Sequence, residues 1–289
     1  MTDISVIILI GQEKIHLKRC IEKLAPLNPR QIFLVESQPD DGGVAIAKET
    51  AAKLGLRLES KFNKWPGTQA VQFNWALDEV EKVAGGRWLV AGEQRTGWIL
   101  RLDADEYLTE QTCDDLKRVF CGAPGGRALP DDVAGLTLEL KRRFMGGEIR
   151  HATNGIRQVR IFRRGKARYA ETLMDERLIV DGKVVDFDGA FYDDNLNGME
   201  WWKNKHRGYA KREAEQAIAG TFHDPRKASY YKLPRYLRAV MYFCIRYFLK
   251  GGFLDRKAGW KWNFWQGLWY RWLVDVEIGR LRSRSASRT

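Results

Sequence analysis

The feature that most constrains the fold is an alternation of short apolar runs with helical stripes in the N-terminal third of the chain. Ile4–Ile10 is a continuous, mainly β-branched run, typical of a strand covered on both faces. Gln31–Val35, Leu56–Phe62 and Trp98–Leu102 are further strand candidates, separated by stretches with apolar residues at helical spacing. This order predicts an α/β fold with a mostly parallel central sheet and helices on both faces.

The pattern changes beyond residue 120. Leu136, Leu138 and Leu140 alternate with polar residues, as in a strand buried on one face. Asp181-Gly182 lies between two short apolar runs and predicts a β-hairpin, because both residues tolerate positive φ. We therefore expect antiparallel or mixed strand pairing in this part of the chain.

Composition narrows the class of partner. The formal net charge of +12 points to an anionic partner, namely nucleic acid, an acidic membrane surface or a phosphorylated substrate. The four cysteines show no C-x-x-C spacing, so we expect neither a disulfide framework nor a zinc site. This cysteine pattern fits a reducing cytoplasm. The N-terminus lacks the basic and apolar segments of a secretion signal. Gly-rich phosphate loops and Ser or Cys nucleophile elbows are also absent from the sequence.

Carboxylates at predicted strand ends carry the candidate chemistry. The run Trp98–Leu102 ends in Asp103, Asp105 and Glu106, and ligands of open α/β sheets lie at the carboxyl ends of strands. Two aspartates one residue apart repel each other unless a cation is near. Mg²⁺ or Mn²⁺ accepts carboxylate oxygens and shares them with the phosphates of a nucleotide. The alternative is a solvated loop after a strand.

Five segments, in this order, resemble glycosyltransferase family 2, and in particular the branch that builds lipopolysaccharide cores and polysaccharide repeat units. They are Ser5–Leu9, Val35–Gly43, Trp65–Gly67, Gln72–Leu77 and Leu102–Glu106. The likeness runs from about Ser5 to Lys211 and continues more weakly to Asp275. The resemblance implies a GT-A (Rossmann-like) fold, a nucleotide-diphosphate sugar donor, a divalent metal and inversion at the anomeric carbon.

The resemblance also implies roles for residues of the donor side. Glu36 corresponds to an aspartate that contacts the base or ribose, and Asp41 to the aspartate before the loop glycine. Gln72 and Asn74 match the helix that lines the donor pocket. The sequence departs from the family pattern on this side, because Glu36 is one methylene longer than aspartate and Pro39-Asp40 replaces a small Ser-Thr pair. These departures leave the base open and motivate a noncatalytic scaffold as one alternative.

The resemblance assigns the chemistry to a second group. Asp103 and Asp105 match the D-x-D pair, with Asp105 the expected direct metal ligand and Asp103 shared between metal and donor. Glu176 lies where the family has the carboxylate that activates the acceptor, with Asp175 as the fallback. His206 is a candidate on other grounds, because it lies in a predicted helix over Trp201–Tyr209 that could close over the donor. It is either a further metal ligand or a structural histidine.

The chain divides into three expected regions. Residues 1–195 are the catalytic domain, with a nucleotide-sugar half over about 1–108 and an acceptor half over about 109–195. Residues 196–279 form an aromatic-rich helical region, and 280–289 a flexible basic tail.

The helical region suggests a membrane partner. Lys232, Arg235, Arg238, Arg246 and Lys250 share one arc of a helical wheel, with apolar residues on the other faces. This pattern is typical of a helix lying on an anionic membrane, and its longest apolar run is too short to span a bilayer. The tryptophans and neighbouring rings from Trp260 to Trp272 resemble a membrane-interface belt. The alternative is that this stripe packs on the catalytic domain or on a second copy of the chain.

These observations lead to one main hypothesis. We expect a metal-dependent inverting glycosyltransferase of the hexosyltransferase type, acting on a lipid-linked or lipopolysaccharide-core saccharide in cell-envelope synthesis. It would lie in the bacterial cytoplasm, peripheral on the inner face of the cytoplasmic membrane. A nucleic-acid-binding protein is the alternative from another class, motivated by interleaved Arg and Trp. We do not expect nucleic acid as the partner, because the strand-end carboxylates would repel phosphate.

Overall fold

The computed structural model describes residues 1–38, 41–87, 97–121, 129–152, 155–170, 177–222 and 224–286. The chain folds as two compact units. Unit 1 holds Met1–Leu140 and Gly155–Asn195, and unit 2 holds Lys141–Asn154 and Leu196–Thr289. The sequence does not predict that Lys141–Asn154 joins the helical unit.

Strands dominate the order of elements in unit 1. They are β1 (Ile4–Ile10), α1 (Lys14–Leu24), β2 (Gln31–Glu36), α2 (Gly43–Lys53), β3 (Leu58–Phe62), α3 (Gln69–Arg87), β4 (Trp98–Asp103), β5 (Glu106–Leu108), α4 (Glu110–Phe120), β6 (Val133–Phe144), β8 (Arg157–Arg163), β9 (Ala167–Tyr169), β10 (Leu178–Val180) and β11 (Lys183–Asp194). The last four residues of β6 belong to unit 2.

The central sheet has the strand order β3-β2-β1-β4-β8-β6-β11-β5. Strands β3, β2, β1 and β4 are parallel, whereas β8 pairs antiparallel with β4 and with β6, and β5 pairs antiparallel with β11. The predicted fold class is confirmed, with helices around a central sheet and an aromatic-rich helical region after it.

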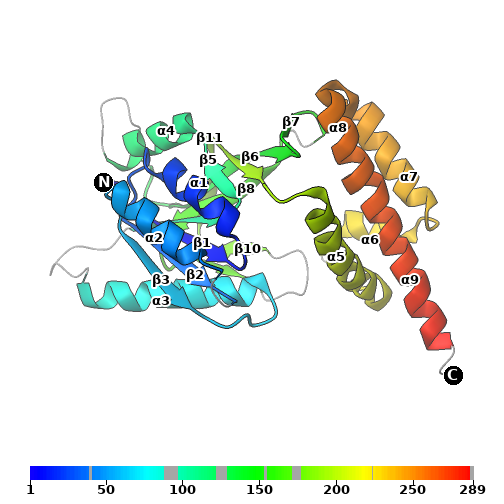
Figure 1. Ribbon diagram of the computed structural model, residues 1–289, viewed down its shortest axis with the longest axis horizontal. Helices are drawn as coiled ribbons and strands as arrows, with labels where there is room; N and C mark the ends of the chain where they lie inside the picture. Colours follow the sequence, from blue (N-terminus) through cyan, green and yellow to red (C-terminus); the bar gives the residue numbers. More distant parts are fainter. Residues whose placement is uncertain are drawn as a thin grey trace. The chain divides into compact units, whose positions relative to one another are not determined.

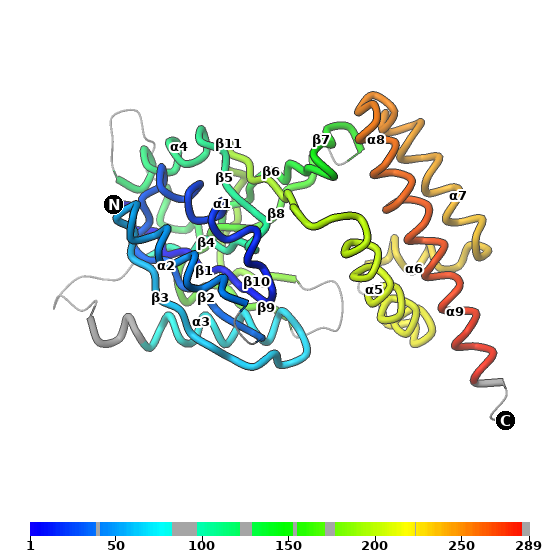
Figure 2. Tube along the Cα trace, in the orientation of Figure 1, coloured from blue at the N-terminus to red at the C-terminus, as the bar shows by residue number. Residues whose placement is uncertain are grey.

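Helices cover both faces of the parallel strands, as Figures 1 and 2 show for α1 and α2 on one side and α3 on the other. The side chains of β1 alternate accordingly, because successive residues of a strand point to opposite faces. Ile4, Val6 and Ile8 join the core under α1 and α2. Ile7 packs in a second core with Phe73 of α3.

The predicted hairpin at Asp181-Gly182 is wrong. A turn does join β10 to β11 there, and Gly182 has φ +131°. However, β10 pairs antiparallel with β9 in a separate two-stranded sheet, whereas β11 enters the central sheet. A Cβ at Gly182 would lie 2.6 Å from the Cβ of Ala134, so the glycine is needed for a close approach where the chain changes sheets.

Unit 2 is mainly helical. Its elements are β7 (Gly147–Ile149), α5 (Met199–Ala219), α6 (Pro225–Lys232), α7 (Leu237–Cys244), η1 (Ile245–Leu249), η2 (Gly252–Asp255), α8 (Arg256–Trp262), η3 (Asn263–Trp269) and α9 (Tyr270–Ala286). None of the helices searched in the described part of the chain is long and apolar enough to cross a membrane. Residues 280–286, expected in a flexible tail, continue α9.

Most of the aromatic residues expected in a membrane belt pack inside unit 2. Trp262 is buried against Phe144 and Trp202, with Trp265 and Trp269 packed at the edge of the same cluster. Tyr270 is buried in a neighbouring cluster between α5 and α9. These rings therefore form the unit's core, which corrects the interpretation of the whole stripe as an interfacial belt.

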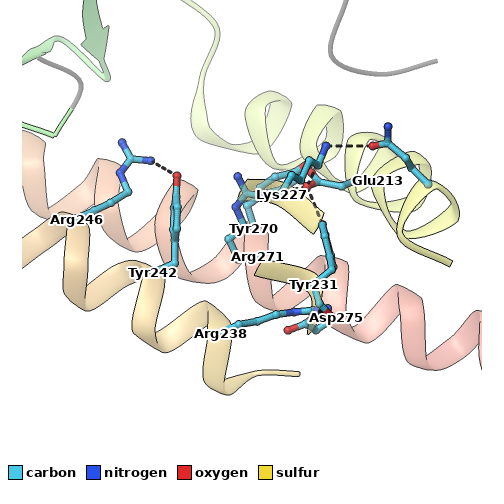
Figure 3. Close-up of polar contacts among 10 residues, drawn as sticks. Glu213, Lys227, Tyr231, Arg238, Tyr242, Arg246, Tyr270, Arg271 and Asp275 are labelled. Carbon is cyan, nitrogen blue, oxygen red and sulfur yellow. Dashed lines mark hydrogen bonds and ion pairs between the residues drawn. The ribbon is translucent and has the colours of Figure 1, made fainter. Parts of the chain in front are cut away.

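A polar network also lies within unit 2 (Figure 3). Glu213 of α5 accepts hydrogen bonds from Tyr231 (2.8 Å), Tyr270 (2.5 Å) and Arg271 (2.8 Å). Burial alone would raise the pKa of Glu213, but the charge of Arg271 and these hydrogen bonds outweigh it and hold the pKa below its ordinary value.

The network predicts acid-sensitive stability. Because the pKa of Glu213 is lower in the folded than in the unfolded chain, its stabilisation is complete above about pH 4.5 and is lost as the pH falls through the folded value. Glu213→Gln should therefore cost about 2–3 kcal/mol at pH 7 and make unfolding less dependent on pH below 4.5. Urea unfolding followed by tryptophan fluorescence measures this, since seven of the eleven tryptophans lie in unit 2.

Glu215→Gln provides the control, because Glu215 is an exposed glutamate on the same helix. The Glu215→Gln chain should unfold like the parent chain, both at pH 7 and below pH 4.5. If the Glu213→Gln chain lost as much stability in acid as the parent, the role given to this carboxylate would be incorrect.

Candidate functional site

The site lies where the order of the parallel strands reverses. The chain passes from β1 outward to β2 and β3, and then returns to β4 on the other side of β1. This is the switch point at which open α/β sheets bind ligands. Glu36 is the register partner of Ile10, and Asp103 is the partner of Leu9. Because neighbouring strands lie about 4.8 Å apart, the backbones of Glu36 and Asp103 flank β1 at a separation of about 10 Å.

Asp103 ends β4 and is held by side chains on both sides. Gln69, the first residue of α3, donates Nε2–H to its Oδ1 at 2.8 Å. Arg101 donates from one Nη to both carboxylate oxygens, at 2.9 and 3.1 Å. Arg101 also lies over the rings of Phe73 and Tyr169, with its Cζ 5.8 and 5.5 Å from their centroids. The position of Asp103 is therefore fixed by the core beneath it.

Asp105 has a different environment. Its Oδ2 accepts a hydrogen bond from Asn195 Nδ2 at 2.7 Å, but it makes no ion pair with any residue that the structure describes. Burial, followed by the negative charges of Asp193 and Asp103, raises its pKa to about 6. Asp105 therefore combines a desolvated carboxylate with like charges, an environment that a cation would stabilise.

The neighbouring carboxylates have arginine partners instead. Glu106 accepts from Arg160 at 2.6 Å and from the backbone N–H of Asp103 at 2.9 Å. Burial nevertheless raises the pKa of Glu106 to about 8. Asp194 accepts from Arg19 at 2.8 Å. Glu106 and Asp194 thus support the turn after β4, whereas Asp105 keeps charge that no described cation neutralises.

Asp41 links the N-termini of two helices. Its Oδ2 accepts from Lys14 N at 3.1 Å and its Oδ1 from Gly43 N at 2.9 Å. Lys14 and Gly43 are the first residues of α1 and α2. Glu36 lies at the end of β2, where its carbonyl accepts from Asn63 N at 2.8 Å. Contact of either carboxylate with a nucleotide stays a prediction.

Gln72 and Asn74 of α3, which were expected in the donor pocket, form hydrogen bonds with the main chain of neighbouring segments. Gln72 is fully buried and exchanges hydrogen bonds with Asn63, through Oε1 at 2.8 Å and through Nε2 at 3.0 Å. Asn74 accepts from Tyr169 N at 2.9 Å and donates to Tyr169 O at 3.0 Å. Gln72 therefore fixes the chain after β3, and Asn74 fixes β9.

Asp175 and Glu176 lie outside the residues that the structure describes. The residues on either side of them are placed, because Ala170 N donates to Arg177 O at 2.9 Å and Tyr169 pairs with Leu178. The ring of Tyr169 lies against Arg101, which donates a hydrogen bond to Asp103. Tyr169, which precedes this segment, is therefore linked to Asp103 through Arg101.

His206 lies in unit 2, on α5. Its ring stacks on Trp202 with centroids 3.6 Å apart, and its Nδ1 is 2.9 Å from Trp202 O. An Nδ1–H donated to this carbonyl leaves Nε2 as the acceptor, the tautomer of a ligating imidazole. Burial lowers the pKa of His206 to about 4. The neutral ring suits either of the predicted roles, a metal ligand or a structural histidine.

The described residues fit a divalent cation in a limited way. Within the described ranges, no three His, Cys, Asp or Glu side chains gather to hold a metal ion. Mg²⁺ in nucleotide sites is commonly held by one or two carboxylates together with substrate phosphates. Asp105, with Asp103 beside it, supplies such a pair. Burial, followed by the charges of Asp193 and Asp103, raises the pKa of Asp105 to about 6.

Four residues of this site were not predicted from the sequence: Gln69, Arg101, Asn195 and Asp193. Arg101 precedes the D-x-D pair within β4 and resembles an ordinary outward-facing strand residue. Asn195 and Asp193 follow at the end of β11, which pairs Asp193 with Glu106. The only sequence signal for Asp193 and Asn195 was the polar cluster Asp193-Asp194-Asn195. The sequence does not show that this cluster lies beside β5, because that pairing depends on the order of strands in the sheet.

Fold and site together define a mixed α/β protein with an acidic site at the switch point of its parallel strands. No protein-family model and no curated protein matches the sequence. Among solved structures, it is similar to S. aureus TarS, with 14% identity and a TM-score of 0.37 over 89% of this chain and 46% of that chain. The chain thus spans about half of the length of TarS.

Two further solved structures are similar at the same level. One is TarS 1-349 in complex with UDP, with 13% identity and a TM-score of 0.37 over 89% of this chain and 75% of that chain. The other is a putative glucose-1-phosphate thymidylyltransferase from Bacillus anthracis in complex with a sucrose, with 10% identity and a TM-score of 0.35 over 66% of this chain and 89% of that chain.

Proposed function

We propose that unit 1 transfers a sugar from a nucleotide-diphosphate donor to a hydroxyl group. The observation that carries this proposal is the position of Asp103 and Asp105 at the carboxyl end of β4, directly at the switch point. A nucleotide bound there would place its diphosphate near the one carboxylate of this turn that lacks a cationic partner among the described residues. The likeness to glycosyltransferase family 2 selects sugar transfer among the reactions of such a site.

Each group has a distinct part in the proposed reaction. Asp105 and Asp103 would hold the divalent ion, which supplies positive charge for the leaving diphosphate. Arg101 and Gln69 keep Asp103 in place through their hydrogen bonds, and Asn195 orients Asp105. Glu36, at the end of β2, would contact the nucleoside end of the donor.

The sugar moves in a single displacement. An acceptor hydroxyl oxygen forms the new bond to the anomeric carbon while the bond from that carbon to the diphosphate oxygen breaks. Glu176, with Asp175 as the fallback, takes the hydroxyl proton. The configuration at the anomeric carbon therefore inverts, and no covalent glycosyl-enzyme forms. A hexosyl group and a lipid-linked or lipopolysaccharide-core saccharide acceptor are the substrates that the sequence resemblance favours.

Release of nucleoside diphosphate from a panel of nucleotide sugars tests the proposal. Water can take the place of the acceptor hydroxyl in this displacement, so the purified full chain should slowly release diphosphate from at least one donor when Mn²⁺ or Mg²⁺ is present. EDTA should stop this release. Release that EDTA does not affect would remove the metal from the proposal. No release from any donor would favour the noncatalytic scaffold.

A further inference from the structure

The helix formed by α7 and η1 presents an apolar face to solvent. Its exposed residues recur at intervals of three and four, the spacing of a single helical face. They are Leu237, Val240, Met241, Cys244, Ile245, Phe248 and Leu249. Leu249 is 81% exposed and Phe248 is 57% exposed. We call this set the apolar face.

The opposite side of the same helix carries arginines that point into unit 2. Arg238 is 3% exposed and pairs with Asp275 of α9, with Nε 2.9 Å from Oδ1. Arg246 donates to Tyr242 at 3.1 Å and to Ala152 O at 3.3 Å. Figure 3 shows both arginines among the polar residues of the unit. The sequence correctly predicts an amphipathic helix within this segment, but Lys232, Arg235 and Lys250 lie outside it and are exposed. The two arginines within the helix are inward, and its apolar side is outward.

The apolar face continues onto neighbouring elements. Trp260 of α8 is 48% exposed and lies against Phe243 and Tyr247, with ring centroids 5.8 and 5.6 Å away. Phe253 is equally exposed and lies 6.3 Å from Tyr247. Isolated exposed apolar side chains are ordinary, but a contiguous set of this extent marks an interaction surface.

The segment of the chain that carries this surface is strongly basic. Residues 225–274 contain eleven Lys or Arg and a single acidic residue, Asp255, whose side chain is 2% exposed beside His151. Seven of the basic residues are exposed, namely Arg226, Lys232, Arg235, Lys250, Arg256, Lys257 and Lys261. This segment alone therefore supplies most of the chain's net charge of +12.

We propose that the apolar face docks unit 2 on a bilayer that contains anionic phospholipid. Leu249, Phe248 and their neighbours would enter the acyl boundary, while Lys250, Lys257 and Lys261 contact lipid phosphates. A helix of this length, about 20 Å, lies along such an interface and does not cross it. The inference goes beyond the proposed sugar transfer and does not depend on it.

Charge decides between a bilayer and a second copy of this chain. Two copies joined through this surface would bring two strongly positive segments together, which opposes association. Nucleic acid would satisfy the charge but would leave the aliphatic side chains in water. An anionic bilayer satisfies both features at once.

Sedimentation of the full chain with vesicles tests the docking proposal. The chain should bind vesicles of phosphatidylcholine with 30% phosphatidylglycerol at least about tenfold more tightly than vesicles of phosphatidylcholine alone, and added salt should weaken binding. Phe248→Ser with Leu249→Ser should reduce binding at least about tenfold, because both side chains are exposed and their loss removes apolar area from the interface. Lys257→Glu with Lys261→Glu should abolish the preference for anionic lipid.

Matched variants in unit 1 provide the controls. Phe62→Ser removes a phenylalanine that is also 57% exposed, and Lys48→Glu with Lys53→Glu reverses two exposed lysines of α2. Both should bind vesicles like the parent chain. Equal binding by the Phe248/Leu249 variant and the parent would overturn the proposal. The proposal would also be overturned if analytical ultracentrifugation showed that the parent chain is a dimer and that the Phe248/Leu249 variant is a monomer.

Discussion

Asp105→Asn is expected to abolish metal-dependent release of nucleoside diphosphate, lowering the rate by at least about 10³-fold. The amide keeps the size of the side chain but removes the charge that a divalent cation needs. The same change should leave the melting temperature equal or higher, because it relieves repulsion by Asp193 and Asp103. The measurement is donor hydrolysis at saturating Mn²⁺, paired with thermal unfolding.

The combination of lost turnover with kept stability distinguishes a metal ligand from a structural carboxylate. A structural role would lower both quantities together. Asp181→Asn is the control, because Asp181 is an exposed aspartate of unit 1 whose side chain is 80% accessible. It should hydrolyse donor at the parent rate. Normal turnover in the Asp105→Asn chain would remove the D-x-D pair from the reaction.

Glu176→Gln is expected to lower sugar transfer to an acceptor by about 10²–10⁴-fold, the range for loss of a general base. Binding of the donor should not change, because the proposed role of Glu176 begins with the acceptor proton. Transfer assays with a saccharide acceptor measure the first effect. Titration calorimetry with the nucleoside diphosphate and Mn²⁺ measures the second.

Asp175→Asn is the neighbouring control and should retain most of the transfer rate. A larger loss in this variant than in Glu176→Gln would move the base to Asp175. If both variants transferred sugar normally, the segment between Ala170 and Arg177 would have no part in the chemistry.

The parallel strands were accessible from sequence because each is a short apolar run, and the D-x-D pair followed directly from the end of β4. The helices around them were visible as stripes, and Leu17, Cys20 and Ile21 of α1 are indeed buried. Such elements can be recognised from the local sequence, because buried side chains recur about every 3.6 residues along a helix and every second residue along a strand that is buried on one face.

Contacts between distant segments were not accessible in the same way. Asn195 reaches Asp105 across 90 positions of the chain, and this contact depends on β11 pairing with β5. The turn at Gly182 has hairpin residues, but the pairing of β10 with β9 decides its role. In unit 2, amphipathicity alone does not tell which side of a helix is inward. Here the side chain of Arg238 is buried because it forms an ion pair with Asp275, a residue of a different helix.

The most direct test of the central claim is the melting temperature of the full chain with a panel of nucleoside diphosphates, with and without Mn²⁺. A ligand at about one hundred times its dissociation constant adds about 2.7 kcal/mol to stability, which shifts the melting temperature by several degrees. The account predicts such a shift for at least one nucleoside diphosphate with Mn²⁺, and its loss in Asp105→Asn. No shift with any of them would contradict a nucleotide site at the switch point of the parallel strands.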